Sequence, residues 1–347
     1  MTTAALLAIP VSAERLRKRL AWQLALLGLL LALASLAAGS DGWSPAALWR
    51  LLSGPDAGLV IGQIRAPRTL GAWLVGALLG IAGAVAQGLF RNPLADPYLL
   101  GSASGATLGV VLVLGAGALT GHAVSLASAD ALTRIGLIGA AFAGSLGGVT
   151  LTLTLARGAM HTSRLLLAGV IVGVVLGAAG DMVTTVVPDA LRGKQAFLLG
   201  STGFLGWDSC AALAAGLLST LPLAWRLSRA LDALTLGEDS AISLGLALGK
   251  LRFLLVAALA LATALAVSQA GLIAFVGLVA PHLVRRFAPA AHGYHVVASA
   301  AMGGTLLLGA DVLARCLVAP QELPVGVLTA VLGGGYLLWL LHRRRLA

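Results

Sequence analysis

The sequence predicts a single all-α integral membrane domain, residues 1–347, with about ten transmembrane helices. Hydrophobic residues make up 59% of the chain and charged residues only 10%, whereas a soluble domain averages about 25% charged residues. Mean hydropathy is +0.97, and apolar runs of about 20 residues follow one another without a long polar linker. Backbone groups in lipid must form hydrogen bonds within the segment, and these runs are far longer than barrel strands, so we expect helices.

Each predicted span is an apolar run that can cover the hydrocarbon core, which takes about 20 residues at roughly 1.5 Å each. The first run follows Arg15-Leu-Arg-Lys-Arg19 and could be a signal peptide. It is long for one, however, so an uncleaved helix is favoured. In chain order, the predicted spans are 20–38, 69–89, 98–119, 135–156, 165–187, 209–226, 252–269, 272–288, 296–314 and 324–342.

Basic residues are unevenly distributed between the predicted loops. With the N-terminus in the cytoplasm, 16 of the 23 Lys and Arg residues lie on the cytoplasmic side and 7 lie outside. This bias follows the positive-inside rule and predicts that both termini are cytoplasmic. Topology therefore explains the net charge of +10, and we expect membrane lipid, and no nucleic acid, as a partner. Cys210 and Cys316 are too few for a disulfide framework and carry no metal spacing.

Two spans share a weak internal similarity. Arg68 precedes a span ending in Ala-Val-Ala-Gln87-Gly, and Arg252 precedes one ending in Ala-Val-Ser-Gln269-Ala-Gly. By the predicted topology, the first runs from outside to inside and the second from inside to outside. Similar segments in opposite directions are typical of inverted-repeat transporters, although two helices rich in alanine, valine and leucine can also match by chance.

The longest polar stretch away from the N-terminal region, 227–251, is predicted to be cytoplasmic. Residues 238–244 could form a short helix, since Gly237 and Gly245 would end it on either side. A short helix that faces the cytoplasm between two spans is a natural docking element for a soluble partner, and an ordinary loop is the alternative. Its apolar positions, Ala241 and Leu244, fall on one face.

An ordered set of motifs over nearly the whole chain, from about residue 50, resembles the FecCD family of ABC-importer permeases, which import cobalamin, haem and ferric siderophores. The chain departs from the family at Gly333-Gly334-Gly335, where Gly-Gly-Pro is common. The matching motifs are Arg65-Ala-Pro-Arg68, Gln87, Arg91-Asn-Pro-Leu-Ala-Asp-Pro97, Gly101 with Gly105-Ala106, Ser163-Arg-Leu-Leu-Leu-Ala-Gly169, Leu236-Gly-Glu with Leu244-Gly245, Gly271-Leu-Ile-Ala-Phe-Val-Gly-Leu-Val-Ala-Pro-His282 with Arg285, Ala310-Asp-Val-Leu-Ala-Arg315, Glu322-Leu-Pro324-Val-Gly326 and Gly333-Gly334.

The resemblance implies the type II importer permease architecture in a bacterial inner membrane. It also implies a homodimer with the path at its twofold axis, two copies of a separate ABC ATPase, and a periplasmic substrate-binding protein. The chain itself would carry no cofactor or metal, because ATP and Mg²⁺ belong to the ATPase. Consistent with this, the nearest approach to a Walker A motif, Gly245-Leu-Ala-Leu-Gly249-Lys250-Leu251, has the wrong spacing and lacks the final Ser or Thr.

Three groups of site residues follow from the resemblance. Arginines at the outer face would pair with acidic residues of the binding protein, which suits the bidentate geometry of guanidinium and carboxylate. Two loops would form the cytoplasmic gates, and the segment 227–251 would couple to the ATPase. The docking residues are Arg65, Arg68 and Arg315; the gate residues are Asn92, Pro93, Leu94, His161, Thr162 and Ser163; the coupling residues are Leu236, Gly237, Glu238, Ala241, Leu244 and Gly245.

The few polar residues inside spans leave rival functions to weigh. Asp311 and Arg315 stand four residues apart and form a local pair most simply. Asp181 has no such partner and could face the path or a second subunit, and His282 is more often structural than a ligand. An ion-coupled secondary transporter would need paired intramembrane acids. An intramembrane serine protease using Ser104 and His282 is the weakest alternative. We expect an importer of a bulky metal chelate, with ferric siderophore, haem and cobalamin all open.

Overall fold

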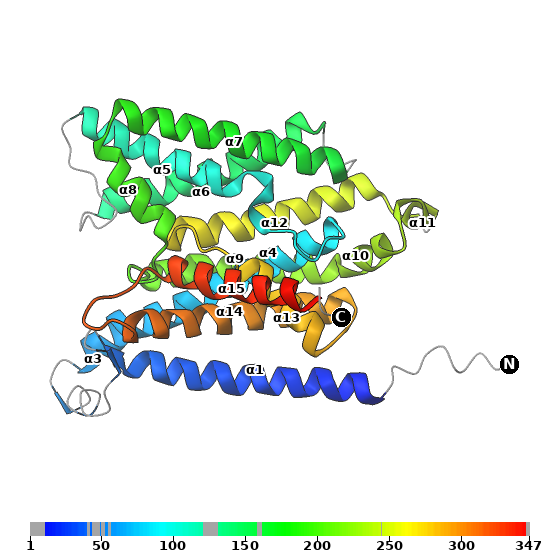
Figure 1. Cartoon of the computed structure of the whole chain (residues 1–347), viewed down its shortest axis with the longest axis horizontal. Coiled ribbons are helices and arrows are strands. Elements are labelled where there is room, and N and C mark those ends of the chain that lie inside the picture. Colours follow the sequence, from blue (N-terminus) through cyan, green and yellow to red (C-terminus); the bar gives the residue numbers. More distant parts are fainter. Residues whose placement is uncertain are drawn as a thin grey trace.

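The structure is a computed structural model that describes residues 11–39, 42–43, 49, 53–54, 57–120, 131–157, 162–243 and 245–344. Long helices lie side by side along one axis (Figure 1). Two antiparallel strands of two residues each, β1 (Ala38–Gly39) and β2 (Gly42–Trp43), pair at one end. The prediction of an all-α membrane domain is confirmed for this part of the chain.

The helices follow one another in the order expected from the apolar runs. Nine of the helices in the described residues are long and apolar enough to cross a membrane. In chain order they and the shorter elements are α1 (Val11–Ala37), α3 (Ala57–Leu59), the π-helical η2 (Val60–Arg65), α4 (Ala66–Leu89), the 3₁₀ turn η3 (Pro97–Leu100), α5 (Ser102–Leu119), α6 (Ala131–Leu155), α7 (Thr162–Val186), α8 (Asp189–Leu199), α9 (Trp207–Arg226), α10 (Ser228–Thr235), α11 (Glu238–Ser243), α12 (Leu248–Ala270), α13 (Val276–Phe287), α14 (His292–Cys316) and α15 (Val325–Arg344).

The predicted span 272–288 is the one that differs. Its helix, α13, has 12 residues and at 1.5 Å per residue covers about 18 Å, which is too short to cross the hydrocarbon core alone. The residues before it are not helical, and Phe275 there adopts a left-handed φ of 66°. The apolar run is long because most of the helix and the non-helical segment before it are buried or half-buried in protein.

The centre of the bundle is α4, which is apolar on all sides and buried along most of its length. Helices α12, α13 and α14 pack around it. Glycines allow the backbones to touch, since a Cβ at Gly80 would collide with the carbonyl of Ser299 on α14, and one at Gly83 would collide with Gly277 on α13. Small residues at such crossings are the usual means of close helix packing in membranes.

Both ends of the bundle have a recognisable set of elements. Helix α1 begins and α15 ends where α10 and α11 lie, and we call this the α11 end (Figure 1). The opposite end, which carries α3 and α8, is the α8 end. Helix α4 runs toward the α11 end and α12 runs away from it, as expected for the two similar segments.

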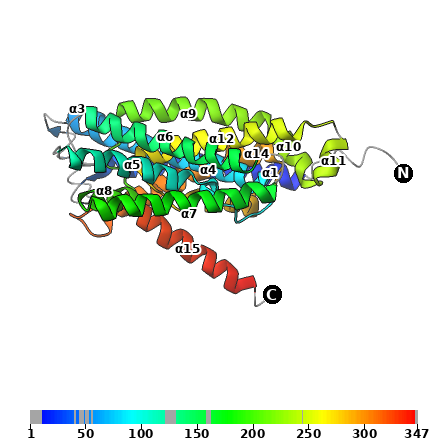
Figure 2. The ribbon, with the colours of Figure 1, turned by 90° about the horizontal axis from the view of Figure 1, so that it is seen from above.

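Helix α15 leaves the bundle at an angle (Figure 2). Its first half packs on α8, α13 and α14, and Gly333 lies against the side chain of Phe275. Other apolar residues of α15 are exposed, among them Val331 and Leu338. An exposed apolar helix face in a membrane protein needs lipid or another subunit to cover it.

Candidate functional site

A charged cluster occupies the α8 end. Asp311 on α14 is completely buried, and it accepts a hydrogen bond from Nη2 of Arg68 at 3.0 Å and another from Nη2 of Arg315 at 2.7 Å. The Thr202 hydroxyl also donates to it. Arg68 reaches Glu322 as well, with Nη1 to Oε1 at 3.0 Å. A buried carboxylate is tolerated only with such partners, and the predicted local pair of Asp311 and Arg315 is confirmed.

Two of the three predicted docking arginines also cap the C-terminal end of α1. The last carbonyls of a helix have no partner within the helix, and positive charge is favourable beside them. Arg65 Nη1 donates to the carbonyls of Leu36 and Ala37 at 2.8 and 3.2 Å. Arg315 Nη1 donates to the Ser35 carbonyl at 3.0 Å. Both guanidinium groups therefore hold α1 against the rest of the bundle.

The expectation that Arg315 is exposed at the outer face is wrong. Its side chain is 3% exposed, because Asp311 one turn away and the end of α1 surround it. Arg65 is half-buried, and the side chain of Arg68 is 13% exposed. Docking through Arg65 and Arg68 stays a prediction, whereas docking through Arg315 would first require its internal bonds to break.

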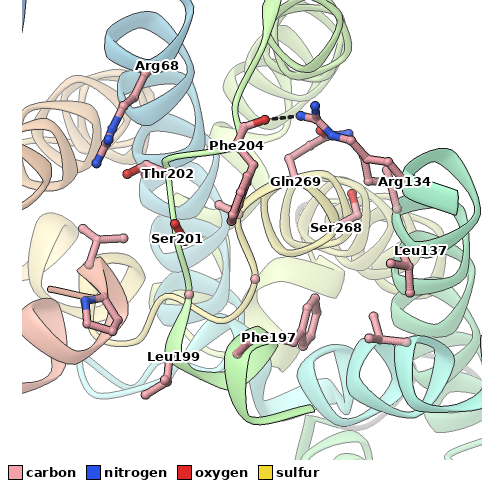
Figure 3. Close-up of a pocket in the computed structure, with 18 of the residues that line it drawn as sticks. Arg68, Arg134, Leu137, Phe197, Leu199, Ser201, Thr202, Phe204, Ser268 and Gln269 are labelled. Carbon is pink, nitrogen blue, oxygen red and sulfur yellow. Dashed lines mark hydrogen bonds between the residues drawn. The ribbon is translucent and has the colours of Figure 1, made fainter. Parts of the chain in front are cut away.

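A cavity of about 280 Å³ opens next to this cluster. Figure 3 shows Ser201, Thr202, Ser268 and Gln269 around it, with Arg134 donating to the carbonyl of Phe204 at one side. Pockets for drug-sized ligands typically measure about 300–1,000 Å³, so this cavity is too small to enclose a large chelate. Among the described residues, no group of three or more His, Cys, Asp or Glu side chains could hold a metal ion.

The first predicted gate loop follows α4 at the α11 end. The helix stops in a Schellman motif, in which Arg91 N–H donates to Gly88 and Asn92 N–H donates to Gln87. The Asn92 side chain then accepts from the N–H of Leu94 at 2.9 Å, which fixes the following turn. Asn92, Pro93 and Leu94 are all exposed. Their predicted position at this end of a span is confirmed, and their role as a gate stays a prediction.

The second predicted gate lies where α7 begins, also at the α11 end. Thr162 and Ser163 form its first turn, and His161 lies outside the described residues. The Thr162 hydroxyl is 3.4 Å from Oε1 of Glu238. The sequence thus placed both gate segments at one end of the bundle, beside the predicted coupling segment.

The coupling segment forms the predicted short helix, with one difference in the face it presents. Gly237 and Gly245 flank α11 with φ values of 106° and 79°, while Leu244 lies outside the described residues. Ala241 is completely buried in the chain itself, so its proposed availability to a soluble partner is wrong. Among the described residues between 236 and 245, the exposed ones are Leu236, Asp239, Ser240, Ile242, Ser243 and Gly245.

Asp181 and His282 both find partners that local spacing does not reveal. Asp181 on α7 pairs with Lys194 on α8, because the chain turns back after α7 and brings residues 13 positions apart into contact. The His282 ring packs edge-on against Tyr336 on α15, with centroids 5.8 Å apart. Within the part of the chain that the structure describes, neither residue belongs to a group of three or more possible metal ligands.

A polar cluster that the sequence analysis missed lies near the α11 end. Gln87 Nε2 donates to the Leu278 carbonyl at 3.0 Å, and its Oε1 accepts from Arg285. Arg285 Nη1 also lies 3.1 Å from His295 Nε2. The cluster ties the end of α4, where the first gate loop starts, to α13 and α14. Gln87 and Arg285 both stand in the family motifs, and that was the available signal.

Comparison with known proteins agrees with this architecture. The FecCD transport family matches residues 26–343. The hemin transport system permease protein of Yersinia pestis is 40% identical over 326 residues, which cover 93% of this chain and 95% of that protein. The vitamin B12 import system permease protein of Klebsiella pneumoniae subsp. pneumoniae is 39% identical over 338 residues, 96% of each chain.

Solved structures give the same fold. An ABC transporter assigned to the metal-chelate type, in an inward-facing conformation, aligns with a TM-score of 0.80 at 28% identity, covering 94% of this chain and 99% of that one. PsaBC from Streptococcus pneumoniae aligns with a TM-score of 0.51 at 18% identity, covering 77% of this chain and 88% of that one. The second likeness concerns the fold alone.

Proposed function

The chain belongs to the FecCD transport family, and on that premise we propose that it is the membrane-spanning permease of an ABC importer for a bulky metal chelate. The cargo would be haem, cobalamin or a ferric siderophore, moved from the periplasm to the cytoplasm. The observation that carries the proposal is the similarity of about 40% over nearly the full length to permeases for two different chelates. Since the two identities are almost equal, the proposal names the class of cargo and no single member.

The assembly we propose contains two copies of this chain, two ATPase subunits and one periplasmic binding protein. Helices α7 and α15 lie on the same side of the bundle (Figure 2) and carry exposed apolar residues, including Val174 and Leu332. A second copy would cover this face. ATP and Mg²⁺ would bind to the ATPase subunits, which would contact the exposed side of α11, with both termini on the same cytoplasmic side.

The binding protein would dock at the α8 end through Arg65 and Arg68. Arg68 is already paired with Asp311 and with the more exposed Glu322, so an incoming carboxylate would compete with Glu322. Exposed ion pairs exchange readily because each is worth little in water. Selectivity for the chelate would rest mainly with the binding protein, because the cavity in this chain is small.

The two aspartates predicted to lie within or near spans, Asp311 and Asp181, give little support to ion-coupled transport. Asp311 is neutralised by two arginines and a hydroxyl, and Asp181 is exposed and paired with Lys194. A proton carrier needs a carboxylate that can gain and lose its proton during transport. Neither aspartate is placed for that role.

The proposed function is tested by reconstituting the permease with its ATPase and binding protein in vesicles, and by offering haem, cobalamin and a ferric siderophore in turn. We expect uptake of one chelate that requires ATP and is lost when the ATPase carries a substituted Walker A lysine. Uptake that survives removal of ATP, and that stops when the proton gradient is dissipated, would instead establish a secondary transporter.

A further inference from the structure

One carboxylate oxygen on α11 lies within reach of three other segments. Oε1 of Glu238 is 2.6 Å from Nη2 of Arg252 on α12. The same oxygen is 3.4 Å from the Thr162 hydroxyl at the start of α7 and 3.9 Å from Nη2 of Arg91 in the turn after α4. We call these four residues the Glu238 cluster. It joins the predicted coupling helix to Thr162 of one gate segment and to Arg91, the residue that precedes the other gate segment.

The three contacts differ in strength. The Arg252 side chain is only 2% exposed, and a buried guanidinium group is costly unless an anion lies beside it. The Arg91 side chain is 44% exposed and its contact is longer, so water competes with it. Glu238 is therefore held firmly to α12, while its contacts to Arg91 and Thr162 can form and break as the segments move.

Arg91 differs from the comparable arginine Arg157 in its contact and not in its backbone. Arg91 has φ 48° and Arg157 has φ 55°, a left-handed conformation that glycine adopts freely. What sets Arg91 apart is the guanidinium group that lies 3.9 Å from Glu238.

Helix α11 lies between two glycines in a left-handed conformation. Gly237 and Gly245 on its two sides have positive φ values, and a side chain at either would meet no neighbouring atom within 4 Å. The glycines are thus needed for their backbone conformation and not for lack of space. A short helix between two such positions can tilt without unfolding, and Glu238, its first residue, tilts with it.

We propose that Glu238 is the positioning residue that transmits movement of α11 to both cytoplasmic gate segments. This inference rests on the proposed function, in which an ATPase subunit contacts the exposed side of α11. When the ATPase displaces α11, Oε1 of Glu238 changes its distance to Arg91 and Thr162, and so shifts the ends of α4 and α7 together. Glu238 would then serve coupling rather than attachment, because its side chain faces the permease.

The test uses the full transporter in vesicles and measures chelate uptake per ATP hydrolysed, for equal amounts of assembled complex. Glu238→Gln keeps the size of the side chain and removes its charge, and we expect uptake per ATP to fall about tenfold or more, within the usual range of coupling between sites. Arg91→Gly relaxes the backbone and removes the contact, and we expect a fall of about threefold, as for an exposed ion pair. The ATPase should copurify with both variants.

Arg157→Gly is the matched control. Arg157 also follows the end of a helix at the α11 end, is exposed, and has φ 55°, so this substitution removes the same charge and relaxes the same backbone conformation at a residue outside the Glu238 cluster. We expect its uptake per ATP to stay near that of the unsubstituted chain. An equal loss in Arg157→Gly and Arg91→Gly would overturn the proposal, since charge alone would then explain both.

Other outcomes are equally decisive. Normal coupling in Glu238→Gln would overturn the proposal directly. Glu238→Gln could fail to assemble because Arg252 loses its anion. In that case Arg91→Gly and Thr162→Ala provide the test, because both leave the buried pair of Glu238 and Arg252 intact. Normal coupling in both variants would refute the inference. Failure of the proposed function looks different, since the unsubstituted chain would then show no ATP-dependent uptake of any chelate.

Discussion

Replacing Arg315 with alanine should destabilise the permease, and the structure allows the size of the effect to be worked out. Removing one partner of a buried ion pair typically costs about 3–5 kcal/mol. Asp311 would retain its hydrogen bonds from Arg68 and Thr202, so the expected cost lies at the lower end of that range. The carbonyls of Ser35 and Ala38 would also lose their donor. We therefore expect a loss of about 3 kcal/mol in the free energy of unfolding.

Arg65→Ala provides the comparison. Arg65 caps the same end of α1, at the carbonyls of Leu36 and Ala37, but it is half-buried and has no buried carboxylate beside it. A charge at a helix end is typically worth about 0.3–1 kcal/mol, so the loss should be about a third of that for Arg315 or less. Unfolding of the purified permease by increasing denaturant in mild detergent measures both values.

One result would refute this reasoning. If Arg315→Ala unfolds like the unsubstituted chain while its complex with the binding protein is lost, the residue acts in docking and its burial has no bearing on stability. The measurement is made without the binding protein present, so a stability change cannot come from lost docking. The opposite pattern, a large loss for Arg315 and a small one for Arg65, supports the structural assignment.

Three further substitutions test other parts of the structure. Gly80→Val should prevent α14 from packing on α4 and lower the free energy of unfolding by about 1–3 kcal/mol or more. Gly139→Ala is the control, because a Cβ there meets nothing within 4 Å, and it should leave the denaturation midpoint unchanged. Similar midpoints for the two variants would contradict the packing of α14 on α4. Burial raises the pKa of Asp96, although the hydrogen bond from the N–H of Tyr98 acts in the opposite direction. The free energy of unfolding should therefore fall as pH rises through that raised pKa, and Asp96→Asn should abolish this pH dependence. The same pH profile in both proteins would exclude Asp96 as its cause. Asp181→Asn breaks an exposed pair, so stability should change by less than about 1 kcal/mol and ATP-driven uptake should persist; loss of uptake would favour ion coupling.

Hydropathy predicted the order of the long helices and nine of the ten spans, because span length is set by the bilayer and is visible in the chain. Turn chemistry also worked locally: Gly237 and Gly245 flank α11, and the prolines of the first gate loop follow the end of α4. Motif resemblance placed both gate segments correctly at one end of the bundle. Each of these inferences uses residues that are close together in sequence.

Predictions about exposure were less successful, because they depend on segments that meet only after folding. Arg315 was predicted to be exposed at the outer face, yet the end of α1, 280 residues earlier in the chain, covers it. Ala241 seemed to offer an apolar face, yet that face packs inward. Hydropathy also could not separate a full span from α13, since a non-helical segment buried in protein is as apolar as a helix in lipid.

The bonds between Arg315 and the end of α1 set an order of events during biosynthesis. The two partners, Arg315 and Ser35, are separated by 280 residues, and at 5–20 residues per second the ribosome needs roughly 14–56 s to make that interval. Throughout this time the carbonyls of Ser35 and Ala38 lack the donor that Arg315 provides, while Arg65, which is made soon after α1, can already bind the carbonyls of Leu36 and Ala37. Helix α1 is thus held in two stages, and a chain truncated before α14 should keep the first set of bonds and lack the second.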